Sequence, residues 1–218
     1  TISVDNIFSL NRLGISDSYE AGRSLTLGVD YKKENLDDID KFFEFKLATV
    51  LRDKFEQDIP VTSTLNRKNS NIYGSVTNKF SDIIKIDYDF AIDNEVSTFE
   101  YNSITTEFSV NNFVTEFNFT ELNGIMGEQN TIENTTSYKV NNNNYFTFNT
   151  RRNRNTSLTE YYDLVYEYKN DCLTAGIKYK KTYYSDRDIK PNEDLMFTIT
   201  LFPLTNLEQK VDQNLYRN

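Results

Sequence analysis

Hydrophobic and polar residues alternate along most of this chain. Between Ile84 and Ile92 every second residue is hydrophobic, whereas the positions between them include Lys85, Asp87 and Asp89. A period of two places the hydrophobic side chains on one face of an extended strand and the charged ones on the other. The pattern therefore predicts a β-strand with two chemically different faces.

The same alternation recurs along the chain. It is clear in four further segments: 24–31, 162–168, 173–181 and 195–201. Six weaker segments also fit a strand: 42–50, 72–80, 104–110, 113–122, 132–140 and 145–152. Asparagine-rich pairs and runs at 111–112, 141–144 and 169–171 predict hairpin turns, because Asn tolerates positive φ. Longer polar stretches at 34–40, 52–69 and 185–194 predict loops, which gives about a dozen strands joined alternately by short turns and longer loops.

Strand length and aromatic content favour a membrane barrel. Strands of about nine to twelve residues suit a tilted bilayer crossing, whereas strands of soluble sheets have about five or six residues. Tyr (15) and Phe (16) are abundant, and several tyrosines, such as Tyr31 and Tyr168, end a strand, as in an interfacial aromatic girdle. We therefore predict an all-β fold, an antiparallel transmembrane β-barrel. A soluble β-sandwich or lipocalin-like barrel remains an alternative, because alternation does not say which face is inside.

Charge and missing residue types exclude several functions. The net charge of −9 argues against nucleic acid as a partner. No run approaches the ~18 apolar residues of a membrane-spanning helix. Histidine is absent, which removes Ser-His-Asp, Cys-His and histidine-based metal sites. We expect no enzyme activity, cofactor or metal site. The acidic groups at 37–40 and 186–194 fit solvated loop charge better than a Ca²⁺ site.

One basic run and one cysteine are the remaining candidates for a site. Arg151, Arg152 and Arg154 form the basic cluster, which would suit phosphate contacts at a membrane rim, or a solvated turn. Cys172 cannot form a disulfide within this chain, since it is the only cysteine. It is either a small buried residue or pairs with a cysteine outside these residues.

Three segments resemble one family of outer-membrane proteins, the lipopolysaccharide-assembly porin (LptD, organic solvent tolerance protein, OstA/Imp family). The first is Asp5 to Arg12 followed by Asp17, Glu20 and Gly22; the second is Asp58-Ile59-Pro60, then Ser63, Leu65 and Ser70 to Gly74; the third is Tyr166 to Cys172, then Gly176 and Tyr183 to Asp188. The chain departs from the family at Asn71, where Asp is frequent. It also departs at Leu173, where some relatives have a second cysteine.

The resemblance implies a transporter that inserts lipopolysaccharide into the outer leaflet of a Gram-negative outer membrane. The chain would be the C-terminal part of a larger barrel (1–204) with a polar tail (205–218). Implied partners are lipopolysaccharide, the plug lipoprotein LptE, the barrel-assembly machinery and, through a missing N-terminal domain, the bridge protein LptA. Cys172 would form a disulfide to that domain. The last strand would be one side of a lateral gate, formed by Leu195, Phe197, Ile199, Leu201, Phe202 and Pro203. A general porin or surface barrel is the alternative within the same fold.

Overall fold

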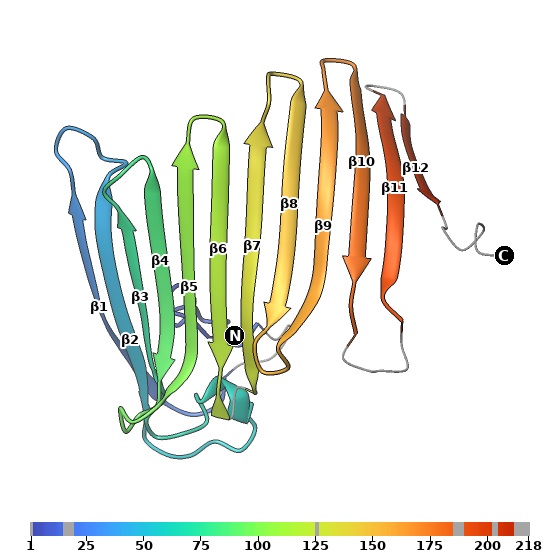
Figure 1. Cartoon of the computed structure of the whole chain (residues 1–218). Helices are drawn as coiled ribbons and strands as arrows, with labels where there is room; N and C mark the ends of the chain where they lie inside the picture. Colours follow the sequence, from blue (N-terminus) through green and yellow to red (C-terminus); the bar gives the residue numbers. More distant parts are fainter. Residues whose placement is uncertain (1, 15–19, 125–126, 185–189, 202–204, 212–218) are drawn as a thin grey trace. The chain divides into compact units, whose positions relative to one another are not determined.

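The chain folds into antiparallel β-strands that pair in the order of the sequence, as a 12-stranded sheet (Figure 1). The computed structural model describes residues 2–14, 20–124, 127–184, 190–201 and 205–211, the last of these by their backbone. The strands are β1 Ser24–Glu34, β2 Phe42–Arg52, β3 Ile72–Lys79, β4 Ile84–Ile92, β5 Phe99–Val110, β6 Phe113–Leu122, β7 Gln129–Lys139, β8 Asn144–Asn153, β9 Leu158–Lys169, β10 Leu173–Thr182, β11 Asn192–Leu201 and β12 Thr205–Val211. The predicted all-β antiparallel fold is confirmed.

Two compact units make up the chain. Unit 1 comprises residues 1–106 and 119–130, and unit 2 comprises residues 107–118 and 131–218. No helix in the described part of the chain has the length and apolar character needed to cross a membrane.

Strand register gives unit 1 one apolar and one polar face. Residues directly opposite each other on paired strands share a face, as do residues two apart on one strand. The apolar face of unit 1 carries Leu25, Leu27, Val29, Tyr31, Phe43, Phe45, Leu47, Ile86, Tyr88 and Phe90. Its polar face carries Ser24, Thr26, Asp30, Lys46, Thr77, Asp87 and Asp89.

Unit 2 has the same division. Its apolar face carries Phe146, Phe148, Leu164, Tyr166, Ile177, Tyr179, Leu195, Phe197 and Ile199. Its polar face carries Thr147, Asn149, Arg151, Asp163, Glu167, Lys178, Lys180 and Thr198. The alternation read from the sequence thus becomes two continuous surfaces within each unit, because the register keeps like residues opposite each other.

The prediction that Leu195 to Phe202 is the last strand is wrong. Residues Leu195 to Leu201 belong to β11, and β12 pairs with them from Leu195↔Val211 to Leu201↔Thr205. The predicted polar tail at 205–218 therefore begins with a strand. Because β11 is paired on both sides, it has no free edge for a lateral gate. Phe202 and Pro203 lie outside the described residues.

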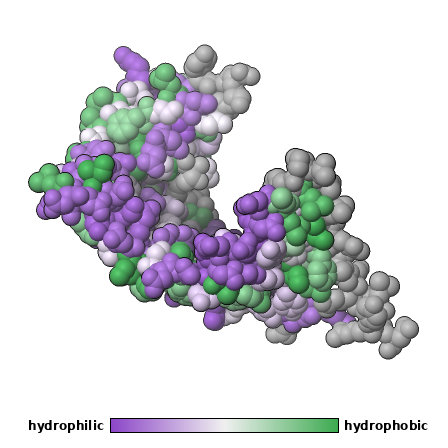
Figure 2. Space-filling model, turned by 90° about the horizontal axis from the view of Figure 1, so that it is seen from above, coloured by the Kyte–Doolittle hydropathy of each residue, from purple (hydrophilic) through white to green (hydrophobic). Residues whose placement is uncertain are grey.

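Connections at one end of the strands have two to seven residues, and those at the other end have four to nineteen. The predicted loop at 34–40 belongs to the end with the shorter connections. One end has the turns 35–41, 80–83, 111–112, 140–143 and 170–172, and the other has the connections 53–71, 93–98, 123–128, 154–157 and 183–191. Asn111 has φ 52, as predicted for a tight hairpin. Figure 2 looks down on the short-turn end, where hydrophilic residues gather. Short turns at one end and longer loops at the other are typical of outer-membrane barrels.

Gly74 of β3 allows an aromatic ring to lie across the strand. It is directly opposite Phe90 of β4, and a Cβ added to Gly74 would lie 2.1 Å from Cζ of that ring. We expect Gly74→Ala to lower the free energy of unfolding by about 1–3 kcal/mol, since the ring must move. The shift of the urea midpoint measures this cost. In a Phe90→Ala background the same change should cost less, and equal costs in both backgrounds would contradict this packing.

Candidate functional site

The N-terminal segment 2–14 packs on the polar face of unit 1. Ile2, Val4 and Ile7 are buried, with Ile7 fully so. They join a cluster with four residues of β2 to β4 and two of the β2–β3 connection: Ala48, Val50, Tyr73, Ala91, Ile59 and Leu65. The hydrophobic core of unit 1 therefore lies on the polar face of its sheet. There the N-terminal segment and the β2–β3 connection cover a short apolar section of the strands.

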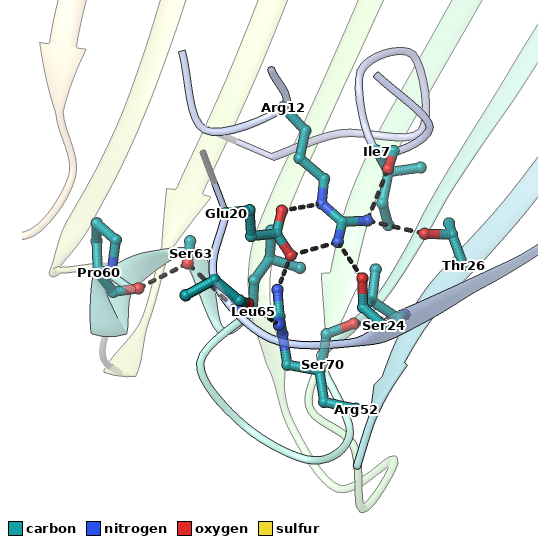
Figure 3. Close-up of polar contacts among 12 residues, drawn as sticks. Ile7, Arg12, Glu20, Ser24, Thr26, Arg52, Pro60, Ser63, Leu65 and Ser70 are labelled. Carbon is teal, nitrogen blue, oxygen red and sulfur yellow. Dashed lines mark hydrogen bonds and ion pairs between the residues drawn. The ribbon is translucent and has the colours of Figure 1, made fainter. Parts of the chain in front are cut away.

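Arg12 fixes this segment to β1. Its guanidinium donates to Thr26 Oγ1 (2.8 Å) and Ser24 Oγ (3.1 Å) of the strand, and to the Ile7 carbonyl (3.0 Å) within the segment. It also donates from Nε to Glu20 Oε2 at 2.6 Å (Figure 3). Arg12 thus uses its planar array of donors to join three parts of the chain.

Glu20 is shared by two arginines. Its carboxylate forms an ion pair with Arg12 and another with Arg52 at the end of β2 (Figure 3). Arg52 also donates to the Ala21 carbonyl at 2.8 Å. Arg12 and Arg52 are only 8% and 7% exposed, and burial lowers the pKa of Arg12 from its ordinary value. Two guanidiniums that are removed from water form ion pairs with the same carboxylate. Replacing any of the three side chains should therefore destabilise the unit.

The β2–β3 connection folds onto the same face. It contains a short 3-10 helix, Val61–Ser63, followed by Thr64 with φ 57. The Tyr73 hydroxyl donates to the Ser63 carbonyl and contacts Thr64 Oγ1, both at 2.8 Å. Asn71 donates to Glu100 of β5 at 2.6 Å. Thr64 and Asn71 are fully buried, so part of this 19-residue stretch (53–71) is packed into the unit.

A cavity lies beside the N-terminal segment. It has a volume of about 330 Å³ and is lined by Val4, Asp5, Phe8, Gly28, Val29, Asp30, Lys46, Leu47 and Ala48. Lys46 contacts Glu44 at 3.0 Å and Asp5 at 3.7 Å. Gly28 gives Phe8 room, since an added Cβ would lie 2.6 Å from its ring. The N-terminal segment and the β2–β3 connection together are called the insert below.

The sequence prediction missed the insert as a structural element, although its residues had been singled out. Four residues that carried the resemblance to the lipopolysaccharide-assembly porin take part in the insert or its support: Arg12, Glu20, Leu65 and Tyr73. Two signals in the sequence point to a folded segment. One is the acidic Glu20 eight residues after Arg12, and the other is the set of hydrophobic residues Ile2, Val4 and Ile7.

The other predicted site residues belong to unit 2. Arg151 is on the polar face and pairs with Glu133 (3.3 Å) and Glu160 (2.8 Å). Arg152 is exposed on the opposite face, and Arg154 is exposed in the β8–β9 turn. Cys172 is an exposed free thiol in the β9–β10 turn, at the short-turn end.

The acidic run at 37–40 lies in the β1–β2 turn, where Asp38 pairs with Lys41 (3.4 Å). Within the described ranges, the acidic residues form no group suited to hold a metal ion. Asp186 and Asp188 lie outside these ranges.

Comparisons with known proteins support the fold. No protein-family model and no curated protein matches this chain. Two triple mutants of the porin of Rhodopseudomonas blastica are similar in structure, and for both the match covers 86% of this chain and 84% of the porin. One has a TM-score of 0.50 at 10% identity and the other 0.49 at 12% identity. The likeness with the TM-score of 0.50 shows the antiparallel β-barrel fold of a porin; nothing supports the lipopolysaccharide-assembly family specifically.

Proposed function

We propose that this chain forms the wall of an outer-membrane β-barrel through which polar solutes diffuse. The apolar face of each unit would face lipid, and the polar face would line the aqueous interior. Backbone groups within the bilayer would be satisfied by pairing between neighbouring strands. The porin-type fold and the uneven lengths of the connections support this proposal.

One observation carries the proposal: the chain covers the polar face of unit 1 and leaves the apolar face bare. Leu25, Val29 and Tyr31 are 57%, 62% and 54% exposed, whereas the insert buries side chains on the other face. A soluble β-sandwich would do the opposite, because apolar surface is buried first in water. Unit 2 also exposes large apolar side chains, such as Phe117 and Leu164.

The insert would narrow the aqueous path on the side of unit 1. It is held by buried ion pairs and a hydrophobic cluster, so we expect a fixed obstruction rather than a freely moving loop. Passage would then favour small polar solutes.

Reconstitution tests this function. The purified chain should need detergent or lipid to remain monomeric and should migrate differently on a gel before and after heating. Liposomes that contain it should swell in a small neutral sugar faster than in a large one. A chain that is monomeric and unfolds cooperatively without detergent would contradict the proposal, and so would folded, inserted protein that passes no sugar.

Lipopolysaccharide insertion is the second candidate, and the position of Cys172 favours it. In outer-membrane barrels the short turns face the periplasm, and Cys172 lies in such a turn, open to a periplasmic domain. A disulfide from there would tie the barrel to a domain that delivers lipid. Lipopolysaccharide, LptE, LptA and the barrel-assembly machinery would be partners in this case, and β12 would supply the edge of a lateral gate.

Thiol labelling separates the two candidates. If the protein inserts lipopolysaccharide, Cys172 in intact cells should react with a maleimide only after reduction, because it is held in a disulfide. If the protein is a general porin, Cys172 should react fully without reductant. Purified chain with reductant is the control and should label completely, since the thiol is exposed.

A further inference from the structure

Arg151 and Arg152 lie on opposite faces of β8, and only one of them is neutralised. Arg151 contacts Glu133 and Glu160 on the polar face. Arg152 lies directly opposite Ile132 of β7, on the apolar face, and it is exposed. Among the residues that the structure describes, no carboxylate lies within 4.0 Å of its guanidinium. A cation on a lipid-facing surface needs a counter-charge, and here the protein supplies none at that distance.

Arg152 is at the membrane boundary rather than in its middle. It is the second-to-last residue of β8, next to the connection 154–157. A long arginine side chain at this height can extend to the lipid headgroups.

A surface cavity lies beside Arg152. Arg152 is directly opposite Thr159 of β9, and Thr159 lines this cavity of about 350 Å³ together with Ser157, Leu158, Tyr162 and Tyr183. The rings of Tyr162 and Tyr183 are 6.0 Å apart at 48°. The cavity therefore combines four hydroxyl groups with two aromatic rings, which is the composition that suits the boundary between headgroup and acyl chain.

The neighbouring cation on this side is already neutralised. Lys181 of β10 lies opposite Tyr162 and contacts Glu193 of β11 at 2.6 Å. Its ammonium also lies 5.6 Å from the Tyr183 ring centre. Lys181 thus has a carboxylate partner, whereas Arg152 has none within 4.0 Å among the described residues.

We propose that Arg152 and this cavity bind the phosphate group of an anionic membrane lipid. The guanidinium would donate to the phosphate oxygens, the tyrosine and threonine hydroxyls would contact the polar backbone of the lipid, and the rings would pack on the first acyl carbons. This inference rests on the proposed membrane insertion.

Fluorescence quenching provides the test, because the chain has no Trp. Tyr183→Trp places a reporter in the cavity, and the protein is reconstituted in phosphatidylcholine vesicles with increasing phosphatidylglycerol that carries bromine near the headgroup. We expect quenching at low mole fractions, and an Arg152→Gln change should raise the required mole fraction about tenfold. Arg23→Gln is the matched control, since it removes an exposed arginine of unit 1 and should change nothing.

Four outcomes would overturn the inference. These are equal quenching by brominated phosphatidylcholine, no effect of Arg152→Gln, an equal effect of Arg23→Gln, and competition by millimolar glycerol phosphate, which would identify a free anion as the ligand. Insertion is scored separately by migration before and after heating. A chain that fails to insert would overturn the proposed function, whereas an inserted chain without selective quenching overturns only this site.

Discussion

Replacing Glu20 by glutamine should lower the free energy of unfolding of unit 1 by about 3–5 kcal/mol. The change keeps the shape of the side chain but removes the charge shared by Arg12 and Arg52, which are 8% and 7% exposed. Two buried guanidiniums would then lack the carboxylate with which both form an ion pair. Urea unfolding in detergent, followed by the circular dichroism of the strands, measures the loss.

Asp53→Asn is the matched control for this prediction. It makes the same carboxylate-to-amide change in an ion pair with Arg23, whose side chain is 90% exposed. Exposed pairs contribute about 0–1 kcal/mol, so the midpoint should hardly move. Equal losses in the two variants would show that the buried pair does not hold the insert.

The same pair of variants examines how the insert affects transport. If the Glu20→Gln protein remains folded at low urea, its N-terminal segment should become sensitive to protease, because Glu20 no longer joins Arg12 of the segment to Arg52 of β2. Liposomes with this variant should then swell faster in large sugars than liposomes with the Asp53→Asn protein. Protease sensitivity without faster swelling would place the insert outside the solute path.

Lysine at Phe148 should destabilise the membrane-inserted protein by about 2–4 kcal/mol, whereas lysine at the next residue, Asn149, should cost less than about 1 kcal/mol. Phe148 is the fifth residue of β8, near the middle of the strand and on the apolar face. Asn149 lies at almost the same height on the polar face. Burial of a charge in hydrocarbon is costly, and the same charge in water is not.

Folding into vesicles of phosphatidylcholine, measured as the urea midpoint of the heat-sensitive gel band, compares Phe148→Lys with Asn149→Lys. The reverse order of stabilities would mean that the polar face meets lipid and would contradict the proposed function. Equal small effects would indicate that β8 does not cross the bilayer.

Local pattern was enough to predict most strands and both of their faces. The segment 84–92 was predicted to the residue as β4, because its alternation is unbroken and charges occur on one face only. The turn at Asn111 was also predictable, since positive φ favours a few residue types. Both features depend on interactions between residues close in the chain.

β12 could not be found in this way. Its sequence, Thr205–Val211, has only Leu207 and Val211 as hydrophobic residues, so the period of two is weak. Pairing with β11 over seven positions makes it a strand. Backbone hydrogen bonds to a neighbour do not require a hydrophobic pattern, and for this reason the pattern missed it.

The sequence by itself determined that this protein is an antiparallel β-sheet with one apolar and one polar face, because side-chain direction in a strand follows from the backbone alone. Only the tertiary structure decided which face is covered. Arg12 and Arg52 are forty positions apart, and they meet at Glu20 because the N-terminal segment folds back over β1 and β2. Such a long-range contact leaves no period in the sequence, yet it turns the polar face into the packed side of unit 1 and leaves the apolar face bare.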